Sequence, residues 1–239
     1  MDEAIKRLVS PVLDKAQAVL GTGFAIVLYG SAARGEYRPG VSDINLLLVA
    51  DSLTPAVLRS LSGVLDELRR ERQPPPLLIE RNEWTRAVDV FPIEVTDMQL
   101  AREVLRGTDP VAGLRVDPAD LRHALEQELR GKLLRLRQVY ALHAADARAL
   151  GEAAARTVGS VAALFRAALV LHGQVVPMAT APALAALENA AGIPTRPTAE
   201  LWGRRRPKGM SCEPQLFEGY LTGVAAAVRV IDQFPRGGN

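Results

Sequence analysis

Two small residues and two oxygen-bearing side chains follow one another closely in the first fifth of the chain. Gly30 and Ser31 come directly after an apolar segment, and Asp43 and Asn45, separated by Ile44, come after a spacer of 11 residues. Side chains alternate along a strand, so residues 43 and 45 are expected to point to the same side. Two neighbouring oxygen ligands suit Mg²⁺, which binds oxygen and above all carboxylates. The spacing therefore predicts a site where oxygen ligands could hold a metal ion.

The segment after the apolar run is suited to hold an anion. Gly30 allows a turn in which the backbone approaches a phosphate closely, and Ser31 adds a hydroxyl and an amide. A short helix over SAARGEY, residues 31–37, would direct its N-terminal amides at the same anion, and Arg34 would add a positive charge. An ordinary turn between a strand and a helix is the alternative interpretation.

The stretch GSAARGEYRPGVSD, residues 30–43, resembles the nucleotidyltransferase domain of the DNA polymerase beta superfamily. That family has a Gly-Ser after a strand, a spacer of similar length, and then two acidic residues that alternate with apolar ones. The resemblance extends over residues 20–100. It implies transfer of a nucleoside monophosphate from a nucleoside triphosphate, such as ATP, to a hydroxyl group of a small molecule or protein. It also implies one or two Mg²⁺ ions held by carboxylates.

The resemblance further implies a third carboxylate on a later strand. Glu94, between Ile93 and Val95, matches best, because a carboxylate in the middle of a strand needs a metal or a partner. A structural salt bridge is its alternative role, and Asp89 and Asp97 are expected to face solvent. The predicted catalytic and metal-binding residues are Asp43, Asn45 and Glu94. The predicted nucleotide-binding residues are Gly30, Ser31 and Arg34.

One position departs from the family pattern. Asn45 stands where the family has a second acidic residue, so a carbonyl oxygen remains but a negative charge is absent. Asp43 and Glu94 alone would then offset the charge of the metal ions before the triphosphate contributes, and we expect weaker metal binding. Two functions stay open at this point: a weakened nucleotidyltransferase, or a catalytically degenerate module that binds a nucleotide or a protein partner.

The elements that position these residues form a small α/β layer. Apolar residues at helical spacing predict a helix over residues 2–20, which Gly21 ends. Thr54 and Pro55 begin a second helix, which QPPP ends at residues 73–76. Short apolar runs predict strands that are covered on both faces, at residues 24–29, 44–50, 76–80 and 89–95. This order differs from a repeated β-α-β winding.

Helical periodicity dominates after residue 113. Apolar stripes predict helices at residues 118–144, 146–173, 182–191 and 214–234. We therefore predict an α+β fold with two domains: a mixed-sheet nucleotidyltransferase domain over residues 1–113 and an all-α helical bundle over residues 114–239. Many members of the superfamily hold the acceptor with such a bundle, so the resemblance implies an acceptor- or partner-binding role for it.

Arg166 and His172 suggest a second possible function for the bundle, that of a ribonuclease. HEPN ribonucleases, whose bundles work with minimal nucleotidyltransferases, carry an Arg and a His several residues apart near a helix end. A separation of six residues turns two side chains about 120° apart on a helix, and Ala167 lacks the usual polar group beside the Arg. A ribonuclease is therefore not favoured.

Composition excludes several classes of protein. The chain has 239 residues, 48% of them hydrophobic and 23% charged, which is enough for a buried core. Cys212 is the one cysteine and there are three histidines, so neither an intrachain disulfide nor a zinc site is expected. No uninterrupted apolar run approaches about 18 residues, and the first residues are acidic, so we expect a cytoplasmic protein without membrane spans.

Charge is distributed unevenly along the sequence. Residues 1–113 hold 13 Lys and Arg against 16 Asp and Glu, whereas residues 114–239 hold 16 against 11. A basic second half is compatible with a polyanion as partner, so nucleic acid stays open as a partner. A solvated, Arg-rich surface is the favoured interpretation.

Overall fold

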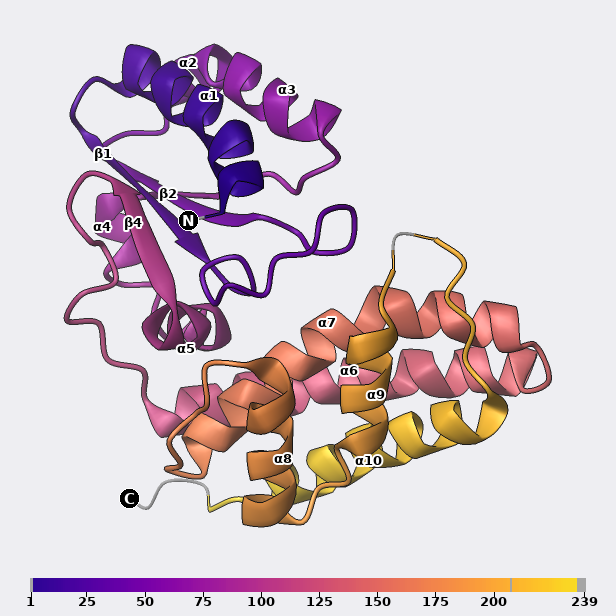
Figure 1. Cartoon of the computed structure of the whole chain (residues 1–239). Helices are drawn as coiled ribbons and strands as arrows, with labels where there is room; N and C mark the ends of the chain where they lie inside the picture. The colour runs from indigo at the N-terminus through magenta and orange to yellow at the C-terminus, as the bar shows by residue number, and fades with distance from the viewer. Residues whose placement is uncertain (1, 207, 236–239) are drawn as a thin grey trace. The chain divides into compact units, whose positions relative to one another are not determined.

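The computed structural model describes residues 2–206 and 208–235, which form two compact units (Figure 1). One unit consists of Met1–Phe91 and Asp97–Arg115, and the other of Pro92–Thr96 and Val116–Asn239. The first contains a β-sheet with helices, and the described residues of the second form helices and their connections. The chain therefore has the predicted α+β class, with a small mixed sheet followed by a mostly helical region.

The sheet of the first unit has four strands in the order β3-β2-β1-β4. They are β1 (Phe24–Tyr29), β2 (Asn45–Ala50), β3 (Leu77–Glu80) and β4 (Arg102–Arg106). β1 runs antiparallel to both of its neighbours, whereas β2 and β3 are parallel. The first three predicted strands are thus confirmed to within one residue at each end.

Both faces of the central strands are buried. Phe24, Ile26 and Leu28 alternate along β1 and pack in one hydrophobic cluster with residues of α1 (Glu3–Leu20) and α3 (Ser62–Arg70). The β1 residues between them are buried as well, and they point to the opposite face. This arrangement explains why the strands appear in the sequence as nearly continuous apolar runs.

The ends of the first helices follow the signals in the sequence. Asp2 caps α1, because its side chain accepts a hydrogen bond from a first-turn amide at 2.7 Å, and the helix ends at Gly21. Thr54 caps α2 (Pro55–Ser60) in the same way at 3.4 Å. The single helix predicted here is interrupted at Leu61, which separates α2 from α3.

The strand predicted at residues 89–95 is wrong, because most of this segment belongs to helix α5 (Pro92–Leu100). Pro92 occupies the first helical turn, where its missing N–H is not needed. Val95 and Met98 lie one turn apart and are both fully buried, so the apolar spacing is helical. The fourth strand is β4, which pairs with the free edge of β1.

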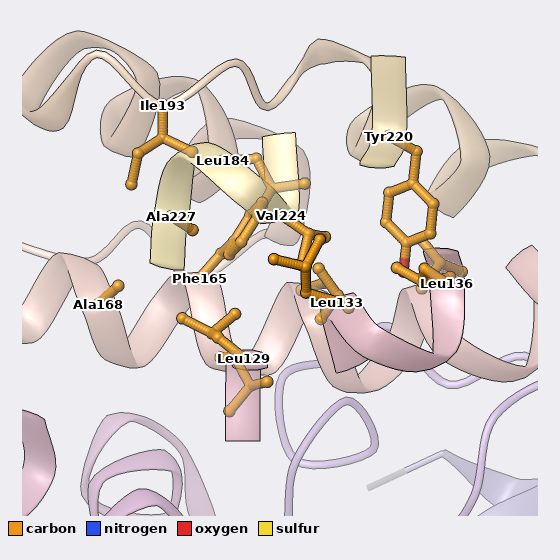
Figure 2. Close-up of a cluster of buried hydrophobic side chains, with 14 of the residues drawn as sticks. Leu129, Leu133, Leu136, Phe165, Ala168, Leu184, Ile193, Tyr220, Val224 and Ala227 are labelled. Atoms are coloured by element: carbon orange, nitrogen blue, oxygen red, sulfur yellow. The ribbon is translucent and has the colours of Figure 1, made fainter. Parts of the chain in front are cut away.

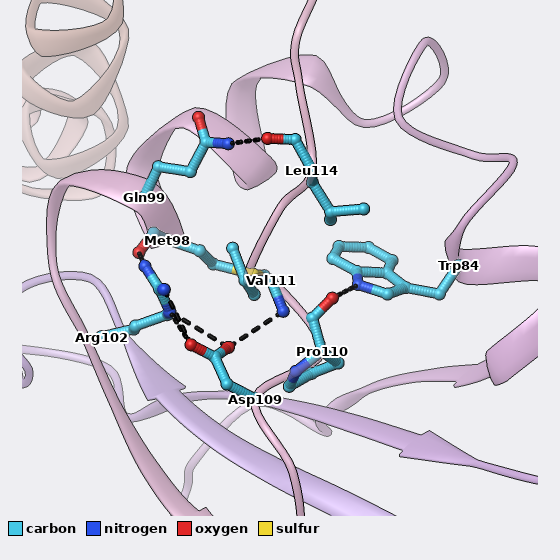
Figure 3. Close-up of polar contacts among 8 residues, drawn as sticks. All are labelled: Trp84, Met98, Gln99, Arg102, Asp109, Pro110, Val111 and Leu114. Carbon is cyan, nitrogen blue, oxygen red and sulfur yellow. Dashed lines mark hydrogen bonds and ion pairs between the residues drawn. The ribbon is translucent and has the colours of Figure 1, made fainter.

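A group of polar contacts fastens the chain after β4 to the rest of the first unit (Figure 3). Arg102 donates two hydrogen bonds to one Asp109 oxygen, at 2.9 and 2.7 Å, and the Val111 amide donates to the other oxygen at 2.9 Å. Trp84, the last residue of α4 (Arg81–Trp84), donates from its indole to the Pro110 carbonyl at 2.9 Å. Burial opposes ionisation of Asp109, but these hydrogen bonds outweigh it and lower its pKa.

The second unit contains five helices among its described residues after residue 115. They are α6 (Pro118–His143), α7 (Ala147–Leu171), α8 (Thr180–Ala191), α9 (Arg196–Arg204) and α10 (Pro214–Gln233). Four of them match predicted helices. The sequence did not indicate α9, because it is short and buries only Thr198, Leu201 and Trp202 among polar and charged neighbours.

Side chains from all five of these helices and from the connections on either side of α9 form the core of the second unit, and Figure 2 shows part of it. Leu129 and Leu133 of α6 pack with Phe165 of α7, Leu184 of α8 and Val224 of α10, and all five are almost completely buried. α7 is the central element, because it packs against α6, α8, α9 and α10. The predicted apolar stripes therefore meet in one cluster.

Helix α7 is long and apolar enough to cross a membrane, judged by length and composition only. Of its most apolar 18-residue window, 61% is buried inside the unit. A buried core helix passes the same test, so this feature is weak evidence for a membrane span.

Close backbone contacts predict opposite effects for two Gly→Ala substitutions. At Gly151 in α7, an added Cβ would overlap the Met210 carbonyl oxygen and lie 2.6 Å from Ser211 Cα. We expect Gly151→Ala to lower the free energy of unfolding by about 1–3 kcal/mol. Gly131 in α6 has open space at this position. Gly131→Ala should raise stability by about 0.5–1 kcal/mol, because alanine is the better helix former. Urea unfolding of the two variants measures the difference, and equal effects would contradict the packing described.

The pKa of Asp109 predicts how one stabilising contact depends on pH. A carboxyl group whose pKa is lowered by folding contributes stability above its unfolded pKa of about 3.9, and this contribution is lost as pH falls through the folded pKa. We expect Asp109→Asn to be less stable than the wild type at pH 7 by about 1–3 kcal/mol. The difference should shrink below pH 4, as thermal melts at several pH values would show. A difference that stays constant down to pH 3 would exclude a role for the charge.

Candidate nucleotide-binding site

The residues of the candidate site lie at one end of the β1–β2 hairpin. The two strands are antiparallel, and Tyr29 opposite Asn45 is their last pair. Gly30 follows with φ of 75°, a left-handed conformation that favours glycine. The connection from residue 30 to residue 44 therefore begins and ends beside this last pair, so that Ser31 and Asp43 lie at the same edge of the sheet.

The first part of this connection is a compact turn. The Arg34 amide donates to the Gly30 carbonyl at 3.2 Å, and the Glu36 amide donates to the Ser31 carbonyl at 2.9 Å. The short helix predicted over residues 31–37 is wrong, because the segment forms successive turns and no regular helix. The amides of residues 31–33 donate no hydrogen bond among the described residues; Ala32 is buried, whereas Ser31 and Ala33 are partly exposed.

The second part of the connection sets the face of Asn45. Ile44 and Leu46 are buried in the cluster beneath α1 and α3. Asn45 is the first residue of β2 and points to the opposite face, as the alternation predicts. Asp43 precedes the strand and is exposed. Tyr37 has a raised pKa, mainly through burial and also through nearby acidic groups that include Asp43.

Gly30 is enclosed by two polar side chains. A Cβ at this position would lie 2.7 Å from the Asn45 amide nitrogen and 3.7 Å from an Asp97 carboxylate oxygen. Any side chain at residue 30 would therefore meet Asn45, in addition to the strain of a positive φ. Asp97 was expected to face solvent, but its side chain is only 14% exposed and it lies beside the candidate site.

Arg34 is held by acidic residues. Its Nη1 donates to Asp97 Oδ1 at 2.8 Å, and its Nε lies 3.5 Å from Glu36 Oε2. The Arg34 side chain is 4% exposed, and its Nε makes no hydrogen bond among the described residues. The predicted phosphate contact is thus a guanidinium that already forms ion pairs within the unit.

Glu94 does not occupy the predicted position in a strand. It lies in the first turn of α5 and is half-buried. Glu94 is therefore not a carboxylate in the middle of a strand, because Pro92 begins a helix two residues before Glu94. Asp97, three residues later on α5, is the acidic residue that sequence analysis missed. Its helical position could have been deduced from Pro92 and from the spacing of Val95 and Met98.

The oxygen ligands present suit an ion that arrives with its substrate. Among residues 2–206 and 208–235, no group of three or more His, Cys, Asp or Glu side chains is placed to hold a metal. Mg²⁺ usually takes one or two protein carboxylates, keeps several waters and binds substrate phosphates. The exposed carboxylate of Asp43 and the amide oxygen of Asn45 fit this mode, and they do not fit a closed protein cage.

The second unit gives no support to a ribonuclease at Arg166 and His172. Arg166 is 1% exposed, and its Nη1 donates to the Pro177 carbonyl at 2.9 Å, which is a structural contact. His172 ends α7 with its ring edge against Phe234, and burial lowers its pKa. Cys212 is buried, and burial raises the pKa of its thiol to about 11, so it is not an activated nucleophile.

Comparison with known proteins assigns the first unit to a family. A family model for the nucleotidyltransferase domain matches residues 6–98, a range that includes the Gly30 turn, Asp43 and Asn45. A search of curated proteins gave no match. The mixed sheet and its hairpin fit the fold of the DNA polymerase beta superfamily. The chain therefore carries a nucleotidyltransferase domain over residues 6–98, and a mostly helical region follows it.

Proposed function

We propose that this protein transfers a nucleoside monophosphate from a nucleoside triphosphate to a hydroxyl acceptor in a Mg²⁺-dependent reaction. One observation carries the proposal: the β1–β2 hairpin brings the Gly30 turn, Ser31, Asn45 and the exposed Asp43 to the same edge of the sheet. The nucleotidyltransferase domain at residues 6–98 includes all of these residues, and its family supports transferase chemistry in general.

Residues 31–34 of the first unit would bind the triphosphate. The free amides of residues 31–33 and the Ser31 hydroxyl would hold the triphosphate oxygens, and Arg34 would add positive charge. In the transfer, the acceptor oxygen bonds to the α-phosphorus while the bond from that phosphorus to the bridging oxygen breaks. Pyrophosphate leaves, and the hydroxyl proton passes to water.

Asp43 and Asn45 would hold the metal. Mg²⁺ bound there supplies charge neutralisation of the triphosphate and activation of the acceptor hydroxyl. Asp43 contributes a full negative charge from an exposed position, whereas Asn45 contributes only an amide oxygen. We also propose that the helical region binds the acceptor, whose chemistry is a hydroxyl on a small molecule or a protein.

A second candidate function is a catalytically degenerate module that binds a nucleotide or a protein partner. Two observations favour it: the neutral residue at position 45, and the pairing of Arg34 with Asp97 and Glu36. The first removes a negative charge from the proposed metal ligands, and the second holds the Arg34 guanidinium in ion pairs within the unit. The two functions differ in turnover, so labelled nucleotides separate them.

The first test is binding and transfer with labelled triphosphates. We expect the wild type to bind ATP or another nucleoside triphosphate in calorimetry, more tightly with Mg²⁺, and to release pyrophosphate when an acceptor is present. Asp43→Ala should lower transfer by about a hundredfold, because it removes the one full charge among the proposed metal ligands. Asp14→Ala, an exposed aspartate on α1, serves as the matched control and should leave transfer unchanged. Binding without turnover would favour the degenerate module, and no binding at millimolar concentrations would contradict both functions.

Asn45→Asp tests whether metal affinity limits the reaction. The new carboxylate would lie close to Asp97 across Gly30, so we expect a lower melting temperature without metal. Addition of Mg²⁺ with ATP should restore the melting temperature of the variant. We also expect the variant to bind Mg²⁺ about tenfold more tightly than the wild type and to transfer nucleotide faster. Thermal melts and calorimetry with and without Mg²⁺ measure these effects. A melting temperature that Mg²⁺ with ATP does not restore would count against a metal-limited enzyme.

A further inference from the structure

The first unit contains two ion pairs between Arg and Asp that differ in how completely the arginine is satisfied. Arg102 donates three hydrogen bonds to Asp109, two from Nε and one from Nη2, and a further one to the Met98 carbonyl at 3.3 Å. Among the described residues, Arg34 donates one hydrogen bond, to Asp97, although its side chain is far more buried, at 4% exposed against 25%. The more buried guanidinium therefore uses fewer of its donors.

An unsatisfied buried donor on a charged group is unfavourable unless something else completes its hydrogen bonds. The Nε of Arg34 is such a donor: it faces Glu36 at 3.5 Å but makes no hydrogen bond among the described residues. Arg102 has no comparable atom, because its Nε bonds to Asp109. The hydrogen bonding of the Arg34 guanidinium is thus incomplete, and Glu36 does not complete it.

Asp97 connects Arg34 to the Gly30 turn. One of its oxygens accepts the Arg34 hydrogen bond at 2.8 Å, and the other lies 3.7 Å from the position of a Gly30 Cβ. The same Cβ position is 2.7 Å from the side-chain amide nitrogen of Asn45. A single carboxylate on α5 therefore fixes the guanidinium beside the turn and beside the first residue of β2, although 63 residues separate it from Arg34.

We propose that Asp97 is a positioning residue for triphosphate binding, which acts by holding the Arg34 guanidinium beside the Gly30 turn with its remaining donors directed to a phosphate. This inference rests on the proposed function. A long arginine side chain loses conformational freedom when it binds a ligand, and a side chain that is already fixed loses less. Asp97 also prevents the loop of residues 30–36 from moving away from α5.

The test measures the dissociation constant of Mg²⁺ with ATP by calorimetry for a set of variants. Asp97→Asn keeps the size of the side chain and removes its charge, and it should weaken binding by about tenfold. Asp97→Glu keeps the charge and should stay within about threefold of the wild type. Asp109→Asn is the matched control, because it removes the acceptor of the other Arg–Asp pair, and its affinity should match the wild type.

Two further measurements separate positioning from general loss of stability. Asp97→Asn combined with Arg34→Gln should bind no more weakly than Arg34→Gln alone, because Asp97 acts through Arg34. The hydrogen-bonded backbone amides of residues 34–36 should exchange with deuterium faster in Asp97→Asn than in Asp109→Asn. The exchange measurement needs no nucleotide, so it tests the connection to α5 directly.

Unchanged or tighter binding by Asp97→Asn would overturn the proposal, since it would show that Asp97 is idle or competes with phosphate for Arg34. Additive losses in the double variant, or unchanged exchange of the loop amides, would overturn it as well. A wild type that binds no triphosphate would refute the proposed function before any variant is measured. Failure of the proposed function and failure of the role of Asp97 are therefore distinguishable.

Discussion

The antiparallel pairing of β1 and β2 is the interaction on which the candidate site depends. The register that places Tyr29 opposite Asn45 decides which residues of the connection lie at the edge of the sheet. A shift by one residue would turn Asn45 into the cluster beneath α1 and α3 and bring Ile44 or Leu46 to the other face. Asn45 is the one polar residue of β2, so a shift would place its side-chain amide among the apolar side chains of that cluster.

The connection between the strands is constrained from outside the hairpin. The Ile44 amide donates to the Gln73 side chain at 2.8 Å, just before β2 begins. Arg34 binds Asp97 of α5 at 2.8 Å, just after the Gly30 turn. Gly30 itself leaves room for the side-chain amide of Asn45, which any side chain at residue 30 would displace. A long connection that is fixed near both ends can keep backbone amides unpaired and accessible, which an anion site requires.

The sequence predicted most of the fold, and its errors have identifiable causes. α1 and four helices of the second unit were predicted, because each has a periodic apolar face and some have clear end signals such as Gly21 and Asp117. The first three strands were predicted from short, nearly continuous apolar runs. The segment after residue 89 was misassigned, because a short apolar run fits either a strand or a helix until tertiary contacts decide. Because of this error, Asp97 was expected to face solvent and Glu94 was expected to lie in a strand. The contact of Arg34 with α5 joins residues far apart in the sequence, which no local pattern can indicate.

The structure gives a physical reason for the neutral residue at position 45. Asp97 already places a carboxylate next to Gly30, and Arg34 is the cation that pairs with it and with Glu36. An aspartate at position 45 would add another negative charge within reach of Asp97, which Arg34 already neutralises. Without a metal ion this arrangement is repulsive, whereas an asparagine keeps the oxygen and adds donors that a carboxylate can accept. Asn45 and the Arg34–Asp97 pair are therefore electrostatically matched, and a change at any one of the three alters the conditions for the other two.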